Sequence, residues 1–159
     1  CFDLSTYLFG TNVSVVSSLL KRVFSSNVDD VVYSTFLHDD SVVGLNYINW
    51  SDSSVRKATN TIEVIGNKGK LIVSKQEINI YLAEENQALN LFAGWNQSYI
   101  TDQNTNVPYY LRGEDFTRQL EEFSSLVNGE IESSRSSLFS ASITDKLLED
   151  TKEFAGELK

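Results

Sequence analysis

The stretch from residue 59 to residue 82, TNTIEVIGNKGKLIVSKQEINIYL, limits the possible folds more than any other part of the chain. Apolar residues occupy every second position around Ile62 and Val64, which is the two-residue period of a strand. The following segment GNKG, residues 66–69, contains residues that accept positive φ in a tight reversal. Apolar residues resume at 71–73 and again at 78, 80 and 82. The pattern predicts an antiparallel meander of three strands with one buried face.

Three further strands are predicted upstream of this meander, at residues 13–23, 31–37 and 42–50. Apolar and polar residues alternate in each, and the polar segment 38–41 provides a turn between the second and the third. In the first strand we expect one face to carry Val13, Val15, Ser17 and Leu19. Before these strands, apolar residues at helical spacing predict a helix over residues 2–9 that ends at Gly10.

Two helices are predicted to finish the chain. Residues 114–127 place their apolar side chains on a single stripe, with Asn128-Gly129 as a stop signal. After a serine-rich linker, a last helix of about five turns runs over residues 139–154. Strands followed by helices predict an α+β domain, an open, mainly antiparallel sheet with helices packed on one face. The apolar stripe of the first of these helices consists of Phe116, Leu120, Phe123 and Val127.

Residues 83–113 lack a regular pattern and form a longer loop than compact domains usually contain. The segment holds the only proline, Pro108, and several aromatic residues. Aromatic side chains in a long loop either pack the loop down or line a binding site. Packing is the more economical interpretation, but this is where we expect a pocket wall if the chain has one. The aromatic residues are Phe92, Trp95, Tyr99, Tyr109 and Tyr110.

Composition excludes several classes of partner. With 159 residues and 41% hydrophobic residues, the chain is long and apolar enough to form one domain with a core. The net charge of -9 argues against binding to nucleic acid or to an anionic membrane, because both require a positive surface. A single cysteine excludes an intrachain disulfide framework and a cysteine-based zinc site, and it fits a reducing, cytoplasmic location.

The sequence offers few groups that could carry catalysis. His38 is the only histidine, and it lies beside Asp39 and Asp40 in a predicted turn. A cation could bind such a run, but adjacent turn residues rarely converge on one ion, so a solvated turn is favoured. No serine has the context of a nucleophile elbow, and the chain has neither GxGxxG nor a P-loop. We therefore predict no catalytic, metal-binding or cofactor-binding residue in this chain.

The start of the chain suggests a fragment. There is no methionine anywhere, and the sequence opens in mid-pattern with CFDLSTYLFG, without a residue to cap the helix. We expect that the chain is one domain cut from a longer protein.

Four segments in this order resemble the C-terminal domain of the Gfo/Idh/MocA family, named after glucose–fructose oxidoreductase, inositol dehydrogenase and a rhizopine-catabolism protein. They are the helix end DLSTYLFG, the strand NYINWS, the hairpin TIEVIGNKGKLIV and the helix segment YYLRGEDFTRQLEEFSSLVNG. The resemblance covers the whole chain, and the hairpin at residues 62–73 is its most specific part.

This resemblance implies that residues 1–159 form a single C-terminal substrate and oligomerisation domain, without the N-terminal Rossmann domain that binds NAD or NADP. The family's catalytic lysine lies in that missing half. Its catalytic histidine would fall immediately before Cys1, and Asp3 matches an aspartate of the pattern that is structural. The complete protein would transfer a hydride between the nicotinamide ring and a sugar, cyclitol or related polyol. The fragment alone would be inactive and would bind no cofactor.

The resemblance further implies a substrate-facing sheet and a homodimer or tetramer formed through it. Polar and aromatic groups suit a polyol, although surface or loop packing explains the same residues equally well. Two alternatives remain open: a sheet-mediated association module without catalysis, and a small-ligand domain that uses the 83–113 loop. The candidate substrate-binding residues are Asn46, Asn49, Trp50, Trp95, Tyr109, Tyr110 and Arg112.

Overall fold

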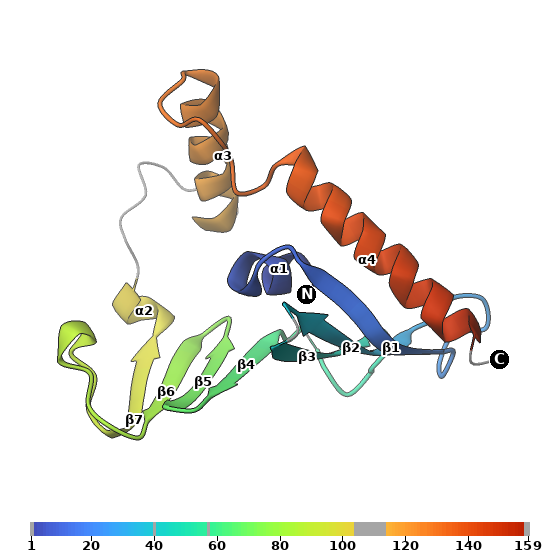
Figure 1. The fold of residues 1–159 in the computed structure, drawn as a ribbon, viewed down its shortest axis with the longest axis horizontal. Helices are drawn as coiled ribbons and strands as arrows, with labels where there is room; N and C mark the ends of the chain where they lie inside the picture. The colour runs from blue at the N-terminus through green and yellow to red at the C-terminus, as the bar shows by residue number, and fades with distance from the viewer. Residues whose placement is uncertain (1, 40, 57, 104–113, 158–159) are drawn as a thin grey trace. The chain divides into compact units, whose positions relative to one another are not determined.

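The structure is a computed structural model that describes residues 2–39, 41–56, 58–103 and 114–157. The chain forms two compact units (Figure 1). Unit 1 contains residues 1–52 and 118–159, and unit 2 contains residues 53–117. Among the described residues, no helix is long and apolar enough to cross a membrane.

Unit 1 is built on a three-stranded antiparallel sheet, which we call sheet A. Its strands are β1 (Val13–Lys21), β2 (Val31–His38) and β3 (Val42–Asn49), in the order β1-β2-β3. Helix α1 (Phe2–Phe9) precedes the sheet and ends at Gly10, whose φ of 92° confirms the predicted stop. Helix α4 (Leu138–Glu157) packs against β1 and against α1.

The core of unit 1 lies between sheet A and these two helices. Phe2 of α1, Val15 of β1, Phe36 of β2 and Leu147 of α4 form one buried cluster. The rings of Phe2 and Phe36 meet edge to face, with centroids 5.2 Å apart and planes at 74°. Four elements are therefore joined by a single apolar contact network.

A β-bulge in β1 changes which residues face this core. The register of β1 against β2 shifts between Val15 and Ser17. Val15 and Ser18 consequently face the helices, while Ser17 and Leu19 face away. The prediction that Val13, Val15, Ser17 and Leu19 share one face was wrong, because the extra residue reverses the alternation.

Helix α3 (Glu114–Val127) crosses the boundary between the two units and is tied to the segment that follows it. The Glu122 carboxylate accepts hydrogen bonds from the Arg135 guanidinium at 2.7 and 3.1 Å, from the Arg135 backbone N–H at 2.8 Å and from the Ser134 hydroxyl at 2.9 Å. These bonds, those of the Arg135 side chain first, lower the pKa of Glu122 to about 2. They hold α3 to the connection that leads into α4.

Unit 2 is built on a four-stranded antiparallel sheet, sheet B, with the order β4-β5-β6-β7. The predicted meander provides three of its strands, β4 (Thr61–Gly66), β5 (Gly69–Ser74) and β6 (Glu77–Leu82). Gly66 pairs with Gly69 across the reversal. A Cβ on Gly69 would collide with the backbone carbonyl of Tyr81, so this position requires glycine.

The prediction of an irregular segment over residues 83–113 was wrong for the fourth strand. Residues Gly94–Tyr99 form β7, which pairs with β6, and they are flanked by a short 3₁₀ helix (Gln87–Leu89) and by α2 (Ile100–Gln103). The strand escaped detection because its less exposed positions hold Gly94, Asn96 and Ser98 instead of aliphatic residues. The remainder of the segment, 104–113, lies outside the described residues.

The α+β class is confirmed, with helices on one face of an antiparallel sheet in unit 1. The predicted helices over 2–9, 114–127 and 139–154 correspond to α1, α3 and α4. The strands divide into two sheets, since hydrogen-bonded neighbours run from β1 to β3 and from β4 to β7.

Candidate functional site

The side of sheet A that faces away from α4 carries an uncharged surface, which we call the outer face. Cross-strand pairing places Leu19, Tyr33 and Tyr47 in one row, and Ser17, Thr35 and Leu45 in the next. Leu37 and Val43 continue the face beside them. None of these eight residues is charged, although the chain as a whole carries a net charge of -9, and the neighbouring row adds one cation, Lys21, opposite Val31.

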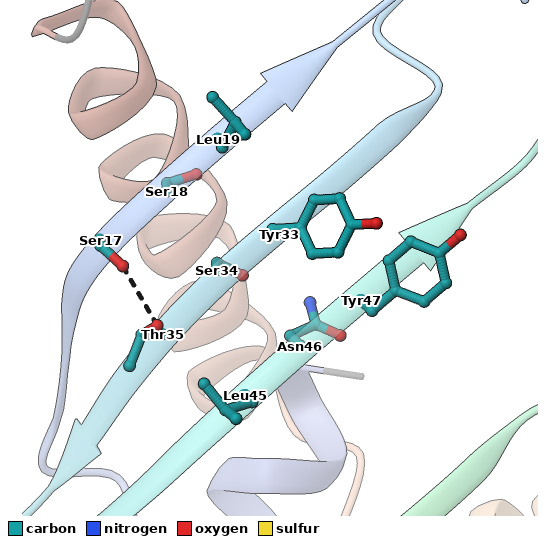
Figure 2. A pocket seen from close by; sticks show the side chains of 9 residues that line it. All are labelled: Ser17, Ser18, Leu19, Tyr33, Ser34, Thr35, Leu45, Asn46 and Tyr47. Carbon is teal, nitrogen blue, oxygen red and sulfur yellow. Dashed lines mark hydrogen bonds between the residues drawn. The ribbon is translucent and has the colours of Figure 1, made fainter. Parts of the chain in front are cut away.

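The outer face contains an open hollow of about 650 Å³, which Figure 2 shows with α4 behind the strands. The rings of Tyr33 and Tyr47 stack across β2 and β3 with centroids 4.8 Å apart. The Ser17 hydroxyl donates a hydrogen bond of 3.1 Å to the Thr35 hydroxyl (Figure 2). Leu45 is 83% exposed and forms another part of the wall.

These properties suit burial against a second apolar surface. Exposed aliphatic and aromatic side chains lose contact with water on association, and here no charge has to be desolvated with them. The stacked tyrosines add rigid contact area, and their hydroxyls can stay hydrogen-bonded at the rim. The outer face holds no carboxylate, imidazole, amine or thiol, and its only polar side-chain groups are hydroxyls.

The inner side of the same strands carries a buried polar row. Ser18, Ser34 and Asn46 are direct cross-strand neighbours, and both serines are almost fully buried. The two hydroxyls and the amide nitrogen of Asn46 have no hydrogen-bond partner among the described residues. Asn46, a predicted substrate-binding residue, belongs to this row, and all three residues of the row also contribute to the lining of the hollow (Figure 2).

The predicted residues Asn49 and Trp50 lie together at the end of β3. The Asn49 amide donates a hydrogen bond of 3.3 Å to the Tyr47 hydroxyl and accepts one of 3.0 Å from the Ser51 backbone N–H. Trp50 follows directly, with its side chain 82% exposed. Asn49 is therefore continuous with the outer face, which supplies Tyr47.

The loop between β1 and β2 is ordered by Asp30 and fixes the backbone of Trp50. The Asp30 carboxylate accepts backbone N–H bonds from Val23, Phe24 and Ser25 at 2.6 to 2.9 Å. These bonds, that of Val23 first, lower the pKa of Asp30. The Asp30 carbonyl in turn accepts the Trp50 N–H at 3.0 Å, so the carboxylate orders the loop that supports Trp50.

The other predicted site residues are placed elsewhere. Trp95 belongs to β7 in unit 2, where its ring lies 5.5 Å from that of Tyr81. Tyr109, Tyr110 and Arg112 lie outside the described residues. The structure thus brings Asn49 and Trp50 together, puts Asn46 on the opposite side of their strand, and holds Trp95 in the other unit.

His38 is not the solvated turn residue that the sequence predicted. It ends β2 with only 1% of its surface exposed, and its Nδ1 lies 3.2 Å from the Gly10 carbonyl oxygen. The Phe9 ring packs 5.7 Å from the imidazole, so the ring helps to close the end of the core. Among the described residues, no group of three potential ligands could hold a metal ion.

The described residues do not fit a nicotinamide dinucleotide. Such a cofactor is held where a parallel strand leads through a glycine-rich turn into a helix. Every strand pairing in the described chain is antiparallel, and the helix that directly follows β7 begins at Ile100 without an intervening glycine. We therefore derive no step through a cofactor bound here.

No family model and no curated protein matches the sequence. Solved structures do match the fold. One is an oxidoreductase from Agrobacterium radiobacter in complex with NAD+, L-tartaric acid and magnesium, at 16% identity and a TM-score of 0.71, which covers 99% of this chain. Another is the UDP-N-acetylglucosamine 3-dehydrogenase of Acidithiobacillus ferrooxidans, at 10% identity and a TM-score of 0.70 over 99% of this chain.

A third match is a 3-ketoreductase from Actinomadura kijaniata in complex with TDP-benzene and NADP, at 14% identity and a TM-score of 0.67 over 96% of this chain. Each match covers only 44% or 45% of the solved protein, so this chain spans less than half the length of these structures. The predicted resemblance to Gfo/Idh/MocA-type oxidoreductases is confirmed at the level of the fold.

Proposed function

We propose that this fold, shared with one half of several nicotinamide-dependent oxidoreductases, serves here as the substrate-facing and self-associating half of such an enzyme. The enzyme would act on a sugar, cyclitol or related polyol, with NAD or NADP bound by a separate domain. The observation that carries the proposal is the match of 99% of this chain to 45% of an oxidoreductase that was solved with NAD+. Units 1 and 2 would then work together as one C-terminal half.

Self-association through sheet A is supported by the outer face. Its exposed leucines and tyrosines form an uncharged surface of the kind that homodimers bury. A twofold axis would place the same surface of two copies in contact, and an uncharged surface faces its own copy without repulsion. The outer face is thus suited to an interface between copies of this chain.

A second apolar surface supports a second partner. The predicted stripe on α3 is present, and its four side chains are between 45% and 69% exposed. We propose that this stripe covers part of the nucleotide-binding domain, because the matched structures contain more than half their length outside this fold. The stripe consists of Phe116, Leu120, Phe123 and Val127.

For the substrate itself we propose the end of β3, where hydrogen bonds hold the Asn49 amide and the Trp50 backbone N–H, and where the Trp50 ring is exposed. An amide and an indole provide the polar and flat apolar contacts that a polyol ring requires. Beyond these two, the residues proposed for the same role are Asn46, Trp95, Tyr109, Tyr110 and Arg112.

The coding sequence immediately upstream of Cys1 tests this function. We expect it to encode a strand, a GxGxxG turn and a helix, followed further on by a lysine and, directly before Cys1, by a histidine. A start codon directly before Cys1 would overturn the proposal. A second test is titration of the 159-residue chain with NADH under fluorescence detection, for which we expect no binding. A saturable signal would contradict the assignment of the cofactor to another domain.

A sheet-mediated association module without catalysis is the second candidate. It is favoured by one observation, namely that the outer face carries no carboxylate, imidazole, amine or thiol. The two candidates differ in the upstream sequence, because only the oxidoreductase requires a dinucleotide-binding unit there.

A further inference from the structure

Strands β6 and β7 carry a stripe of aromatic and polar side chains on one face of sheet B. Three successive cross-strand pairs form it, and we call it the β6–β7 stripe. The pairs are Tyr81 with Trp95, Asn79 with Gln97, and Glu77 with Tyr99. Residues two apart on a strand share a face, so the stripe runs about 13 Å along the two strands.

One end of the stripe is an exposed aromatic pair. The rings of Tyr81 and Trp95 lie 5.5 Å apart at an angle of 59°, and Trp95 is 61% exposed. A cross-strand aromatic pair stabilises a sheet by itself. The pairing with Tyr81 leaves the other face of the Trp95 indole open. This electron-rich face attracts partly positive C–H groups.

The other end is a fixed hydrogen-bonding group. The Gln97 amide donates a hydrogen bond of 2.9 Å to the Glu77 carboxylate, and its oxygen accepts one of 3.2 Å from the Tyr99 hydroxyl. The Tyr99 backbone N–H is itself held by Asp102 at 2.9 Å. Each bond uses only part of the capacity of the amide, so one N–H and one lone pair of Gln97 remain for a ligand.

The Asn79 amide lies between the aromatic pair and Glu77 on the same strand. Among the described residues, no side chain or backbone group is hydrogen-bonded to it. The stripe therefore presents two amides and one carboxylate beside an aromatic surface. This combination provides donors and acceptors for hydroxyl groups together with a flat apolar contact.

The charges near the stripe disfavour an anionic ligand. The Glu77 carboxylate is part of the stripe, and the nearest cation on the same face, Lys70 of β5, is paired with Glu63 at 2.8 Å. The chain is also strongly acidic. Glu77 would repel a phosphate or a carboxylate, whereas a neutral polyhydroxylated molecule would meet no such repulsion.

We propose that the β6–β7 stripe binds a neutral saccharide, with one pyranose ring stacked on Trp95 and the hydroxyls of a linked ring bonded to Gln97, Asn79 and Glu77. A pyranose ring with bonds of about 1.5 Å is about 3 Å across between opposite ring atoms, and about 5 Å with its hydroxyl groups. Two linked rings therefore fit the length of the stripe. This inference extends the proposed function, which already gives Trp95 a role in binding a polyol, and it is argued from the side chains of sheet B.

Nuclear magnetic resonance of the two tryptophan indoles tests the proposal directly. The chain has only two tryptophans, so the variants Trp50→Phe and Trp95→Phe assign the two indole N–H signals. Cellobiose, two β-linked glucose rings, is titrated to about 20 mM, because we expect a Kd on the order of 1 mM. We expect a saturable shift of the Trp95 indole, while the backbone amides of α4 in unit 1 serve as the internal control.

Two variants complete the test. Gln97→Ala should raise the Kd about fivefold or more, the loss expected for one hydrogen bond, and Trp95→Ala should abolish the shifts of the other stripe residues. Amide spectra show whether each variant remains folded, and Gln97→Ala keeps the proposal testable if Trp95→Ala unfolds.

Three results would overturn the proposal: no shift of the Trp95 indole, shifts of the α4 amides as large as that of the Trp95 indole, or a larger shift with choline than with cellobiose. The last would assign the aromatic pair to a cation. None of these results bears on the upstream coding sequence, so the oxidoreductase assignment stands or falls separately.

Discussion

The outer face of sheet A and the β6–β7 stripe of sheet B contain the same kind of aromatic pair, but the residues around each pair differ. Each centres on an exposed cross-strand aromatic pair, Tyr33 with Tyr47 in one and Tyr81 with Trp95 in the other. Leucine, valine and small hydroxyl residues surround the first pair, whereas amides and a carboxylate surround the second. The residues around each aromatic pair therefore determine what it can bind. The outer face suits burial against protein, and the β6–β7 stripe suits a hydrated ligand.

The two sheets also differ in what supports them. Sheet A has α4 on its inner side and a core around Phe36, whereas no described strand residue of sheet B is fully buried. The stability of unit 1 should then depend on a few large buried side chains. That of unit 2 should depend on backbone pairing and on a well-formed reversal at residues 66–69.

The largest expected effect comes from emptying the core beneath sheet A. Phe36→Ala should cost about 3–5 kcal/mol, because it removes a buried ring that contacts Phe2. Hydrogen exchange followed by mass spectrometry should show lost protection in β1, β2 and α4, with β4 to β7 unchanged. The control is Tyr33→Ala on the outer face of the same strand. Equal loss of protection in sheet B would show that the two units unfold together.

A smaller effect is expected from crowding the backbone of sheet B. Gly69→Ala should cost about 1–3 kcal/mol, since the new Cβ meets the carbonyl of Tyr81 and β6 must shift. Gly66→Ala is the matched control, because it stands across the same reversal with no atom closer than 3.9 Å. The measurement is again hydrogen exchange, with lost protection confined to β5 to β7. Equal effects of the two substitutions would contradict the close approach at Gly69.

The smallest expected effect is the loss of stability of unit 1 at low pH. The pKa of Glu122 falls from 4.5 to about 2 in the folded chain, because Arg135 binds the ionised form. A lowered folded-state pKa stabilises the fold above pH 4.5, and this contribution is lost as the pH falls towards 2. Urea midpoints of wild type and Glu122→Gln should differ at neutral pH and converge in acid.

The control for that measurement is Glu121→Gln on the same helix, whose carboxylate pairs with Arg118 at 3.3 Å on the surface. Glu121→Gln should change the urea midpoint only slightly, as is usual for the loss of an exposed ion pair. If the urea midpoints of wild type and Glu122→Gln differed by the same amount at every pH, the role given to the Glu122–Arg135 contact would be refuted.

Most of the architecture followed from periodicity. The meander at residues 59–82 and the stripe of α3 were predicted because apolar residues mark buried positions at strand or helix spacing. Strand β7 was missed because this signal is absent there: its less exposed positions are Gly94, Asn96 and Ser98 instead of apolar residues. The bulge after Val15 was missed because nothing in the sequence marks an extra residue in a strand of valines and serines.

The candidate surfaces were less predictable than the fold. Alternation in residues 42–50 indicated which side chains share a side with Tyr47, but not which side the helices cover. That required the pairing of α4 with sheet A, which depends on residues more than a hundred positions away. The burial of His38 likewise depends on Phe9 and on the Gly10 carbonyl, which only the tertiary fold brings to it.

The most direct test of the account is sedimentation analysis of the 159-residue chain at about 100 μM, in the range where a micromolar dimer is populated. We predict a dimer that Leu45→Lys, on the outer face, weakens at least tenfold, because a charge would be buried at the interface. Ile65→Lys, on a residue of sheet B that is 74% exposed against 83% for Leu45, should leave the dimer intact. A monomeric wild type, or dissociation by Ile65→Lys and not by Leu45→Lys, would contradict the assignment of the outer face to self-association.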